Sequence, residues 1–160
     1  MFNVKYKHVG YSALTFDFKM EIRKAKPTDS IRISELLLQL EYPVYDEFIE
    51  ERVAELSQHQ NEELIIAEKE GKIIAVLSIH FIPQLAVQGS FARISYFCVD
   101  EHARSKGMGR ELEKYCEHVA RDRGCDRIEV HCHSRRIRAH EFYERQGYIE
   151  SPKYFIKKLN

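Results

Sequence analysis

The stretch that decides the fold is Val99-Asp100-Glu101-His102-Ala103-Arg104-Ser105-Lys106-Gly107-Met108-Gly109-Arg110. An apolar segment, residues 92–99, leads into it and predicts a buried strand. The residues that follow predict a long helix, because apolar side chains recur on one helical face as Leu112, Tyr115, Cys116 and Val119. A strand therefore runs through a turn with two glycines directly into a helix.

This turn has the properties of an anion-binding site. The first turn of a helix carries backbone N–H groups without an internal partner, and the helix dipole adds partial positive charge there. Gly107 and Gly109 would let a diphosphate approach the backbone because neither has a Cβ, and Arg104, Lys106 and Arg110 add positive charge. The spacing, Arg-x-x-Gly-x-Gly, matches neither the dinucleotide fingerprint nor the NTP-hydrolysing loop. Taken alone, it also fits a turn that merely starts a helix.

The remaining sequence predicts a mixed α/β domain around one sheet. Further strands are expected at residues 20–25, 64–67, 73–81, 128–132, 148–149 and 154–159. Three further helices are expected: one that begins at 27–29 with a capping hydroxyl from Thr28, one over 46–58, and a short one around 139–143. Residues 82–90 predict a loop, and Gly124 predicts a left-handed end for the long helix.

Composition narrows the class of protein. The 160 residues suit one domain, and the balance of 25 basic and 25 acidic residues gives no electrostatic case for binding nucleic acid. No apolar run is long enough to span a bilayer and no signal peptide is apparent, so we expect a cytoplasmic protein. Residues 1–19 show no sustained period and are interpreted as an N-terminal extension of undefined role before a domain at 20–160.

The four cysteines, Cys98, Cys116, Cys125 and Cys132, form no C-x-x-C pair and fit reduced thiols, mostly small buried side chains. His131, Cys132 and His133 invite a metal interpretation. On a strand, however, the two histidines would point one way and the cysteine the other, and no second ligand pair has a recognised spacing. No metal site is expected.

Two signatures resemble those of the GNAT family of N-acetyltransferases. Arg104–Gly109, with Val99 five residues upstream, is similar to the acetyl-CoA signature of that family. Residues 139–148, from Ala139 to Tyr148, resemble its second signature, A-x-x-F-Y-E-x-x-G-[FY], and 154–159 resemble a common family ending. The resemblance covers nearly all of the chain outside the leader. It implies a central, splayed, mostly antiparallel sheet flanked by helices, and a transfer of acetyl from acetyl-CoA to an amine.

The resemblance also implies roles for individual residues. The pyrophosphate would lie on Arg104, Ser105, Lys106, Gly107, Met108, Gly109 and Arg110. The pantetheine arm would pair with the backbone of Phe97, Cys98 and Val99, in the opening between this strand and residues 128–132. Arg136 and Ala139 would lie beside the cofactor. Tyr143 would protonate the departing thiolate, although a packing role for this aromatic remains open.

The catalytic base is less clearly indicated. The glutamate that the histone-acetylating branch carries on the central strand is replaced by Arg93, and Arg136 stands where many relatives have asparagine. Glu129 and Glu41 are the leading candidates, and Tyr42, Tyr96, His131 and His140 are further ones. The missing glutamate leaves open an acyl-CoA-binding sensor without turnover, whereas Tyr143 favours a catalyst.

The acceptor side is rich in acidic residues: Glu41, Asp46, Glu47, Glu50 and Glu51. These would suit a cationic amine, although such acidic residues are more often a solvated helix face. A homodimer is expected at the level of the family only.

Overall fold

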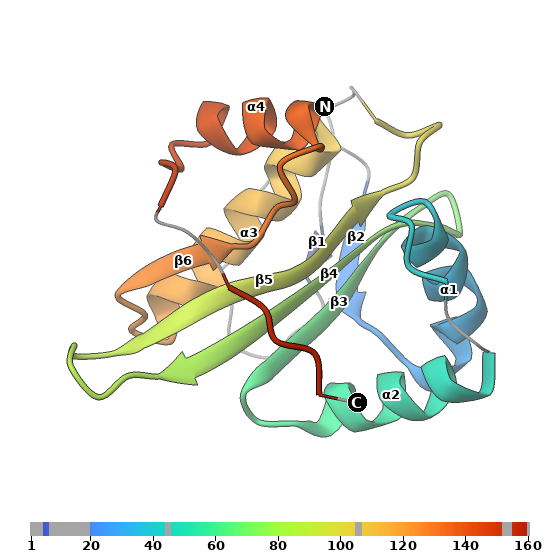
Figure 1. Cartoon of the computed structure of the whole chain (residues 1–160). Helices are drawn as coiled ribbons and strands as arrows, with labels where there is room; N and C mark the ends of the chain where they lie inside the picture. The colour runs from blue at the N-terminus through green and yellow to red at the C-terminus, as the bar shows by residue number, and fades with distance from the viewer. Residues whose placement is uncertain (1–4, 7–19, 44–45, 105–106, 152–154, 160) are drawn as a thin grey trace.

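The computed structural model describes residues 5–6, 20–43, 46–104, 107–151 and 155–159 (Figure 1). The strands are β1 (Lys5–Tyr6), β2 (Glu21–Lys24), β3 (Glu62–Lys69), β4 (Lys72–Pro83), β5 (Ser90–Val99) and β6 (Arg127–Val130). The helices are α1 (Ser30–Leu38), α2 (Asp46–Gln58), α3 (Met108–Asp122) and α4 (Ile137–Arg145), and a 3-10 turn, Pro27–Asp29, precedes α1. The bounds expected for α2 are those observed.

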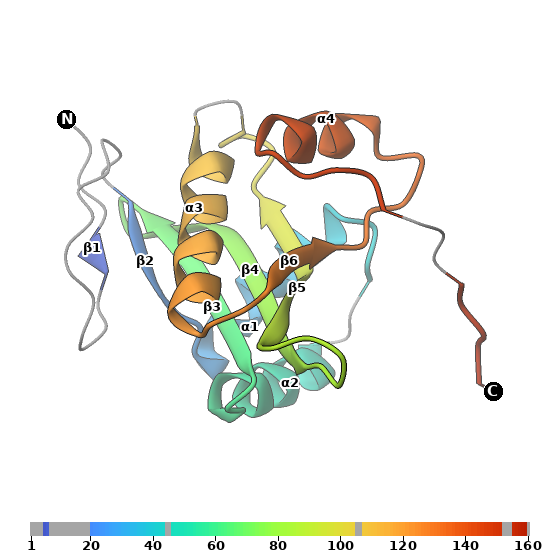
Figure 2. The ribbon, with the colours of Figure 1, turned by 90° about the vertical axis from the view of Figure 1, so that its left-hand side faces the viewer.

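One six-stranded sheet, in the order β1-β2-β3-β4-β5-β6, forms the centre of the molecule. Its inner pairs, from β2 to β5, are antiparallel, whereas β1 runs parallel to β2 and β6 runs parallel to β5. Helices α1 and α2 cover one face and α3 the other, while α4 lies beyond the end of β5 (Figures 1 and 2). The expected mixed sheet flanked by helices is confirmed.

The core has one layer on each face of the sheet. On the α3 side, Ile65, Leu77 and Ile79 pack with α3 through the predicted face of Leu112, Tyr115, Cys116 and Val119, all buried. On the other side, Ile66, Val76 and Cys98 pack with Leu36 of α1 and Val53 of α2. Full burial of one such aliphatic side chain contributes about 1.5–3 kcal/mol, so both layers hold the helices firmly to the sheet.

The start of α1 differs from expectation. The backbone N–H of Lys26 donates to the Asp29 carboxylate at 2.8 Å, so this side chain caps the segment in place of the Thr28 hydroxyl. Arg23 of β2 also donates two hydrogen bonds to Asp29, at 2.7 and 3.0 Å. A carboxylate replaces the hydroxyl because it can accept from both the cap and a neighbouring strand at once.

The C-terminal strands are the main error of the sequence interpretation. Strand β6 ends at Val130, so His131 and Cys132 lie outside it, and neither 148–149 nor 155–159 forms a strand; Tyr154 lies outside the described residues. Residues 155–159 project away from the fold (Figure 2), and no described strand lies beside them to satisfy their backbone groups. Phe155, Ile156 and Leu159 are 84, 73 and 90% exposed.

Three expectations from the sequence concern membrane-spanning helices, the cysteines and metal ligands. No helix among the described residues is long and apolar enough to cross a membrane. All four cysteines are free thiols; Cys98 and Cys116 are buried, and Cys125 and Cys132 are half-buried. In the described part of the chain, no group of three metal-ligating side chains comes together.

Candidate active site

The sheet opens at one point between its two parallel strands. Pairing of β5 with β6 ends at Ile94 and Val130. The ladder between β4 and β5 shifts register at the same place: Ile79 faces Ile94 but Ser78 faces Tyr96, which leaves Ser95 as the extra residue of a β-bulge. A bulge increases local twist, so β5 turns away from β6 from this residue onward. The second half of β5, including Phe97, Cys98 and Val99, keeps only β4 as a partner.

The open half of β5 leads into the glycine-containing turn and α3. Gly107 begins α3 with a left-handed backbone, φ 80°, which glycine adopts without steric cost. Among the described residues, the backbone N–H groups of Met108, Gly109 and Arg110 donate to no protein acceptor, as expected for the first turn of a helix. Arg104 Nε donates to the Val99 carbonyl at 2.8 Å and ties the turn to the strand end. Ser105 and Lys106 lie outside the described residues.

Helix α4 packs against this opening through the aromatic ring of Phe142. Phe142 packs edge-on against Phe97 of β5, with ring centroids 5.9 Å apart. A Cβ built on Gly109 would lie 3.3 Å from Phe142 Cε2, so the glycine makes room for the ring as well as for any ligand. The ring therefore joins the open strand, the start of α3 and α4. Ala139 is half-buried on the same helix.

Tyr143 lies beside this ring in a largely apolar setting. Its ring centroid is 5.2 Å from that of Phe142 and 5.3 Å from that of Tyr148. Burial raises the pKa of Tyr143 above its ordinary value of 10, with the nearby Cys132 and Cys116 acting in the same direction. The phenol therefore keeps its proton at neutral pH, which is the state that a proton donor requires.

Both leading base candidates are engaged by arginines. Glu129 Oε2 accepts a hydrogen bond from Arg93 at 3.0 Å, and Glu41 is ion-paired with Arg135. Glu41 also has a left-handed backbone, φ 63°. Each of these carboxylates thus already has a guanidinium partner in the folded chain. His140 Nε2 lies 3.1 Å from the His133 carbonyl.

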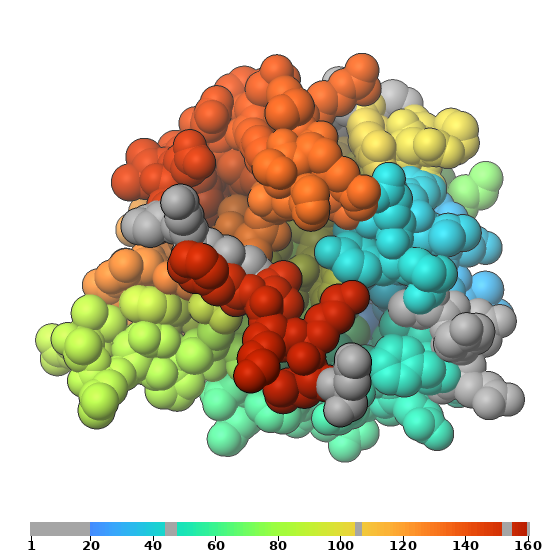
Figure 3. Space-filling model, viewed as in Figure 1, coloured from blue at the N-terminus to red at the C-terminus, as the bar shows by residue number. Residues whose placement is uncertain are grey.

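The connection between α1 and α2 meets the start of α4 across the opening. The Arg136 guanidinium donates to the Leu40 carbonyl and lies over the Tyr42 ring, 5.8 Å from its centroid. The Tyr42 ring in turn meets Tyr96 of β5 edge-on at 5.3 Å. We term the two segments that meet here, 40–42 and 135–136, the clasp; it includes the ion pair of Glu41 with Arg135. Figure 3 shows a hollow beside the two segments of the clasp, with β5 at its floor.

The structure identifies several residues that the sequence interpretation missed. Asp100, 7% exposed, accepts from the His102 backbone N–H at 2.9 Å, from Gln39 at 3.3 Å and from Arg32, and so fixes the turn to α1. Burial alone would raise the pKa of Asp100, but these hydrogen bonds outweigh it and lower the pKa below the usual 3.8. His80 of β4 is bonded through Nδ1 to the Glu62 carboxylate. A lone histidine inside the apolar run 73–83 is the signal that could have found this pair.

Comparisons with known proteins agree with this geometry. Residues 32–148 match the acetyltransferase (GNAT) family. An aminoalkylphosphonate N-acetyltransferase from Salmonella typhimurium is 28% identical over 144 residues, which are 87% of this chain and 91% of the relative. A transcriptional regulator from Bacillus halodurans superposes with a TM-score of 0.80 and 26% identity, over 88% of this chain and 99% of the other. Glucosamine-6-phosphate N-acetyltransferase from Arabidopsis thaliana gives 0.74 and 25%, over 88% and 99%.

A strand that parts from its parallel neighbour, a glycine-containing turn and a helix laid over the gap are the arrangement of an acyl-transfer enzyme of this fold. The chain belongs to the GNAT acetyltransferase family. The family and its relatives support N-acetyltransferase activity.

Proposed function

We propose that the protein transfers the acetyl group of acetyl-CoA directly to an amine in the opening between β5 and β6. The observation that carries the proposal is that β5 has no β6 partner beyond Ile94, and that the chain then leads into α3, whose first N–H groups donate to no acceptor among the described residues. The edge of β5 would hydrogen-bond the amide-bearing arm through Phe97, Cys98 and Val99. The start of α3, with Arg104 and Arg110 exposed beside it, would bind the diphosphate.

The chemistry requires a proton donor and an oxyanion donor at the opening. Attack of the neutral amine on the thioester carbonyl forms the C–N bond and breaks the C–S bond, and Tyr143 gives its proton to the leaving sulfur. A backbone N–H on the open half of β5 would stabilise the developing oxyanion. The new amide nitrogen releases a proton, and Tyr143 recovers one through solvent.

We propose an acceptor that carries an anionic group beside its amine. Of the acidic residues that suggested a cationic acceptor, Glu41 is paired with Arg135, and Glu50 and Glu51 are exposed on α2, as on a solvated helix face. Arg93 offers a buried Nε with no acceptor among the described residues. Two relatives are named for amines that bear a phosphonate or a phosphate.

The test combines binding with turnover. Calorimetry with acetyl-CoA should give one site per chain, and thiol release should follow addition of 2-aminoethylphosphonate or glucosamine 6-phosphate, but not of spermidine. Release with spermidine alone would refute the anionic acceptor. An absence of acetyl-CoA binding would refute the function as a whole.

A sensor that binds acyl-CoA without turnover is the second candidate, and the name of the Bacillus halodurans structure, a transcriptional regulator, favours it. The replacement of the strand glutamate by Arg93 points the same way. Tight acetyl-CoA binding, with no thiol release across the amine panel, would select this candidate.

We also propose a homodimer. Three apolar side chains of the projecting C-terminal segment, Phe155, Ile156 and Leu159, are 73–90% exposed, and a second copy would bury them. Light scattering should give twice the chain mass, and removal of residues 155–160 should give the monomer mass. A monomer at micromolar concentration would refute this assembly.

A further inference from the structure

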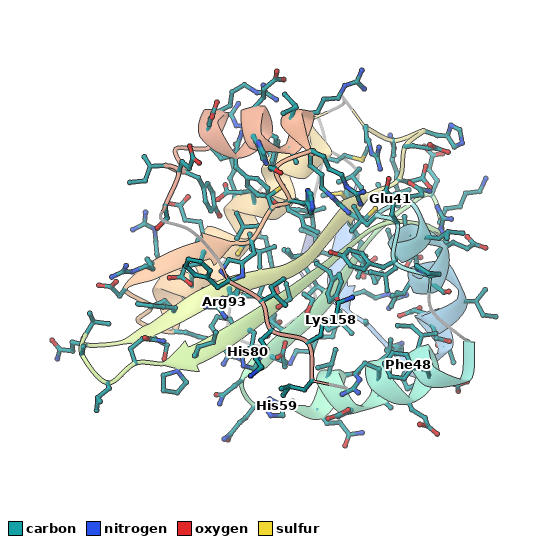
Figure 4. All side chains as sticks on the ribbon, viewed as in Figure 1. Glu41, Phe48, His59, His80, Arg93 and Lys158 are labelled. Atoms are coloured by element: carbon teal, nitrogen blue, oxygen red, sulfur yellow. The ribbon has the colours of Figure 1, made fainter. Side chains whose placement is uncertain are left out.

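Four polar residues face one another in register across four strands. Glu62 of β3 pairs with His80 of β4, His80 pairs with Arg93 of β5, and Arg93 pairs with Glu129 of β6. Neighbouring strands are about 4.8 Å apart, so the row spans roughly 15 Å of the sheet. The row projects on the face that carries α1 and α2, because the alternate residues of β4, Leu77 and Ile79, pack on the α3 side. Figure 4 shows Arg93, His80 and His59 following one another toward the end of α2.

The row divides into two bonded pairs. His80 Nδ1 meets the carboxylate of Glu62, whose side chain is 8% exposed, whereas the His80 side chain is 40% exposed. The second pair is Arg93 with Glu129. With Nδ1 held by Glu62, Nε2 is the imidazole atom left for an external proton, and no described residue bonds to it. A histidine fixed at one nitrogen by a carboxylate, with the other nitrogen open, is the usual form of a general base.

The row also lies at the right place along the strands. Arg93 and Glu129 are the last but one pair of β5 with β6, immediately before the opening. Ser78 and Tyr96 form the next row on the same face, and Tyr96 belongs to the floor of the hollow beneath the clasp. His80 is thus one strand and one row from the place where the acceptor amine would wait.

We propose that His80 is the catalytic base of the acetyl transfer and that Glu62 is its positioning residue. The proposal rests on the function proposed above. His80 Nε2 takes one proton from the acceptor ammonium, directly or through one water, which leaves a neutral amine. The amine nitrogen then bonds to the acetyl carbon as the C–S bond breaks, and the imidazolium returns its proton to solvent. Neither Glu129 nor Glu41 has to leave its arginine.

Burial and two neighbouring basic side chains favour the neutral form of His80, and they outweigh the Glu62 carboxylate, which favours the protonated form. Burial is the largest influence and lowers the pKa of His80 below the usual 6.5, and the positive charge of His59 and Arg93 lowers it further. His59 stacks on His80 with ring centroids 6.3 Å apart, from the segment between α2 and β3. Glu62 faces the ring from β3 and Arg93 faces it from β5. At neutral pH the imidazole is therefore ready to accept a proton.

The test is His80→Gln, with His118→Gln as its matched control. His118 is also a carboxylate-paired histidine, 3.4 Å from Asp122, but it lies on α3 across the sheet. We expect His80→Gln to lower kcat by about 100-fold or more, with unchanged acetyl-CoA affinity, and to remove the acid limb of the kcat/KM profile. His118→Gln should keep both kcat and the limb. Imidazole in the buffer should restore part of the activity of His80→Ala.

Glu62→Gln separates positioning from proton transfer. It removes the negative charge beside the imidazole, so the acid limb should shift to lower pH while kcat falls less than in His80→Gln. If the wild-type enzyme turns over and His80→Gln retains its kcat and its acid limb, the role of His80 is refuted while the proposed function stands. If the wild-type enzyme releases no thiol with any amine, both are refuted.

Discussion

The ring of Phe142 occupies the space into which a side chain on Gly109 would project, with 3.3 Å from the built Cβ to Phe142 Cε2. Because Gly109 is in the first turn of α3 and Phe142 is in α4, this contact sets the distance between the two helices. A methyl group at Gly109 would press on this ring, so the absence of a Cβ suits the packing of α4 as well as the close approach of a ligand to the turn.

The effect of Gly109→Ala on the free energy of unfolding should therefore change sign when Phe142 is replaced by a smaller residue. In the wild-type background the methyl group presses on the ring, and we expect a loss of about 1–2 kcal/mol in the free energy of unfolding. With Phe142→Leu the space opens, and the same change should stabilise by up to about 1 kcal/mol, because alanine is the better helix former. Urea unfolding of the four variants measures the coupling. Additive effects would show that the two residues do not share this space.

Asp100 should make the free energy of unfolding depend on pH in the acidic range. Because its pKa is lowered in the folded state, its contribution is present above the unfolded value, near 3.9, and is lost as pH falls through the folded pKa. The pKa of Asp29 is also lowered. Burial would raise this pKa, but the hydrogen bonds from Arg23 and Lys26 outweigh burial. Asp100→Asn should cost roughly 1–3 kcal/mol at pH 7 and reduce the loss of stability below pH 4.

The control is Asp126→Asn. Asp126 is paired with Arg127 at 2.7 Å, but the pair is much more exposed, with side chains 35 and 51% accessible. Its removal should cost less than about 1 kcal/mol. Equal costs for the two changes, in chemical unfolding at pH 7, would contradict the anchoring role of Asp100.

Tyr143→Phe should reduce kcat by about 100-fold and leave the acetyl-CoA dissociation constant within about twofold, because it removes only the transferable proton. Tyr148→Phe is the matched comparison. The Tyr148 hydroxyl donates to Glu113 at 3.2 Å, so its loss should lower stability rather than turnover. Stopped-flow turnover and calorimetry distinguish the two. Weaker cofactor binding with normal kcat in Tyr143→Phe would assign the tyrosine to packing.

Arg136→Lys should loosen the clasp. Lysine cannot reproduce a planar guanidinium that both stacks on Tyr42 and donates to the Leu40 carbonyl. We expect KM for the acceptor to rise about tenfold, with a smaller change in acetyl-CoA affinity. Arg138→Lys, an exposed position on α4, should leave both constants unchanged. Steady-state kinetics with each substrate varied in turn measures both effects. An equal effect on the acceptor and on acetyl-CoA would contradict the prediction and place Arg136 at the cofactor.

The elements that the sequence predicted well are those whose signal is local. Helix α2 and the buried face of α3 follow from apolar periodicity, and the left-handed end at Gly124, φ 64°, follows from residue type. The strands expected at 148–149 and 154–159 were wrong where they can be described, because a strand exists only beside a partner and the sequence does not show which edge is available.

The candidate site likewise has a part with a local sequence signal and a part that depends on contacts between distant residues. The turn and α4 were recognisable from residue order. The arginines that neutralise Glu129 and Glu41 come from 36 and 94 residues away, so their pairing depends on the folded chain. The Glu62 and His80 pair also needs the register of β3 on β4, which shifts at a bulge between Ala67 and Glu68.

The unmatched Ser95 also limits how this strand can be redesigned. Counting in twos from Arg93 would place the next acceptor-facing side chain at Ser95, but the bulge moves that orientation to Tyr96, which touches Tyr42. A glutamate grafted onto β5 by sequence alignment alone would thus be displaced by one position and could face the wrong layer of the protein. Deleting Ser95 would instead leave Tyr96 opposite Ser78 and every later side chain on its present face. The deletion would remove the bulge and the extra twist that turns β5 away from β6, while the two packed layers kept their residues.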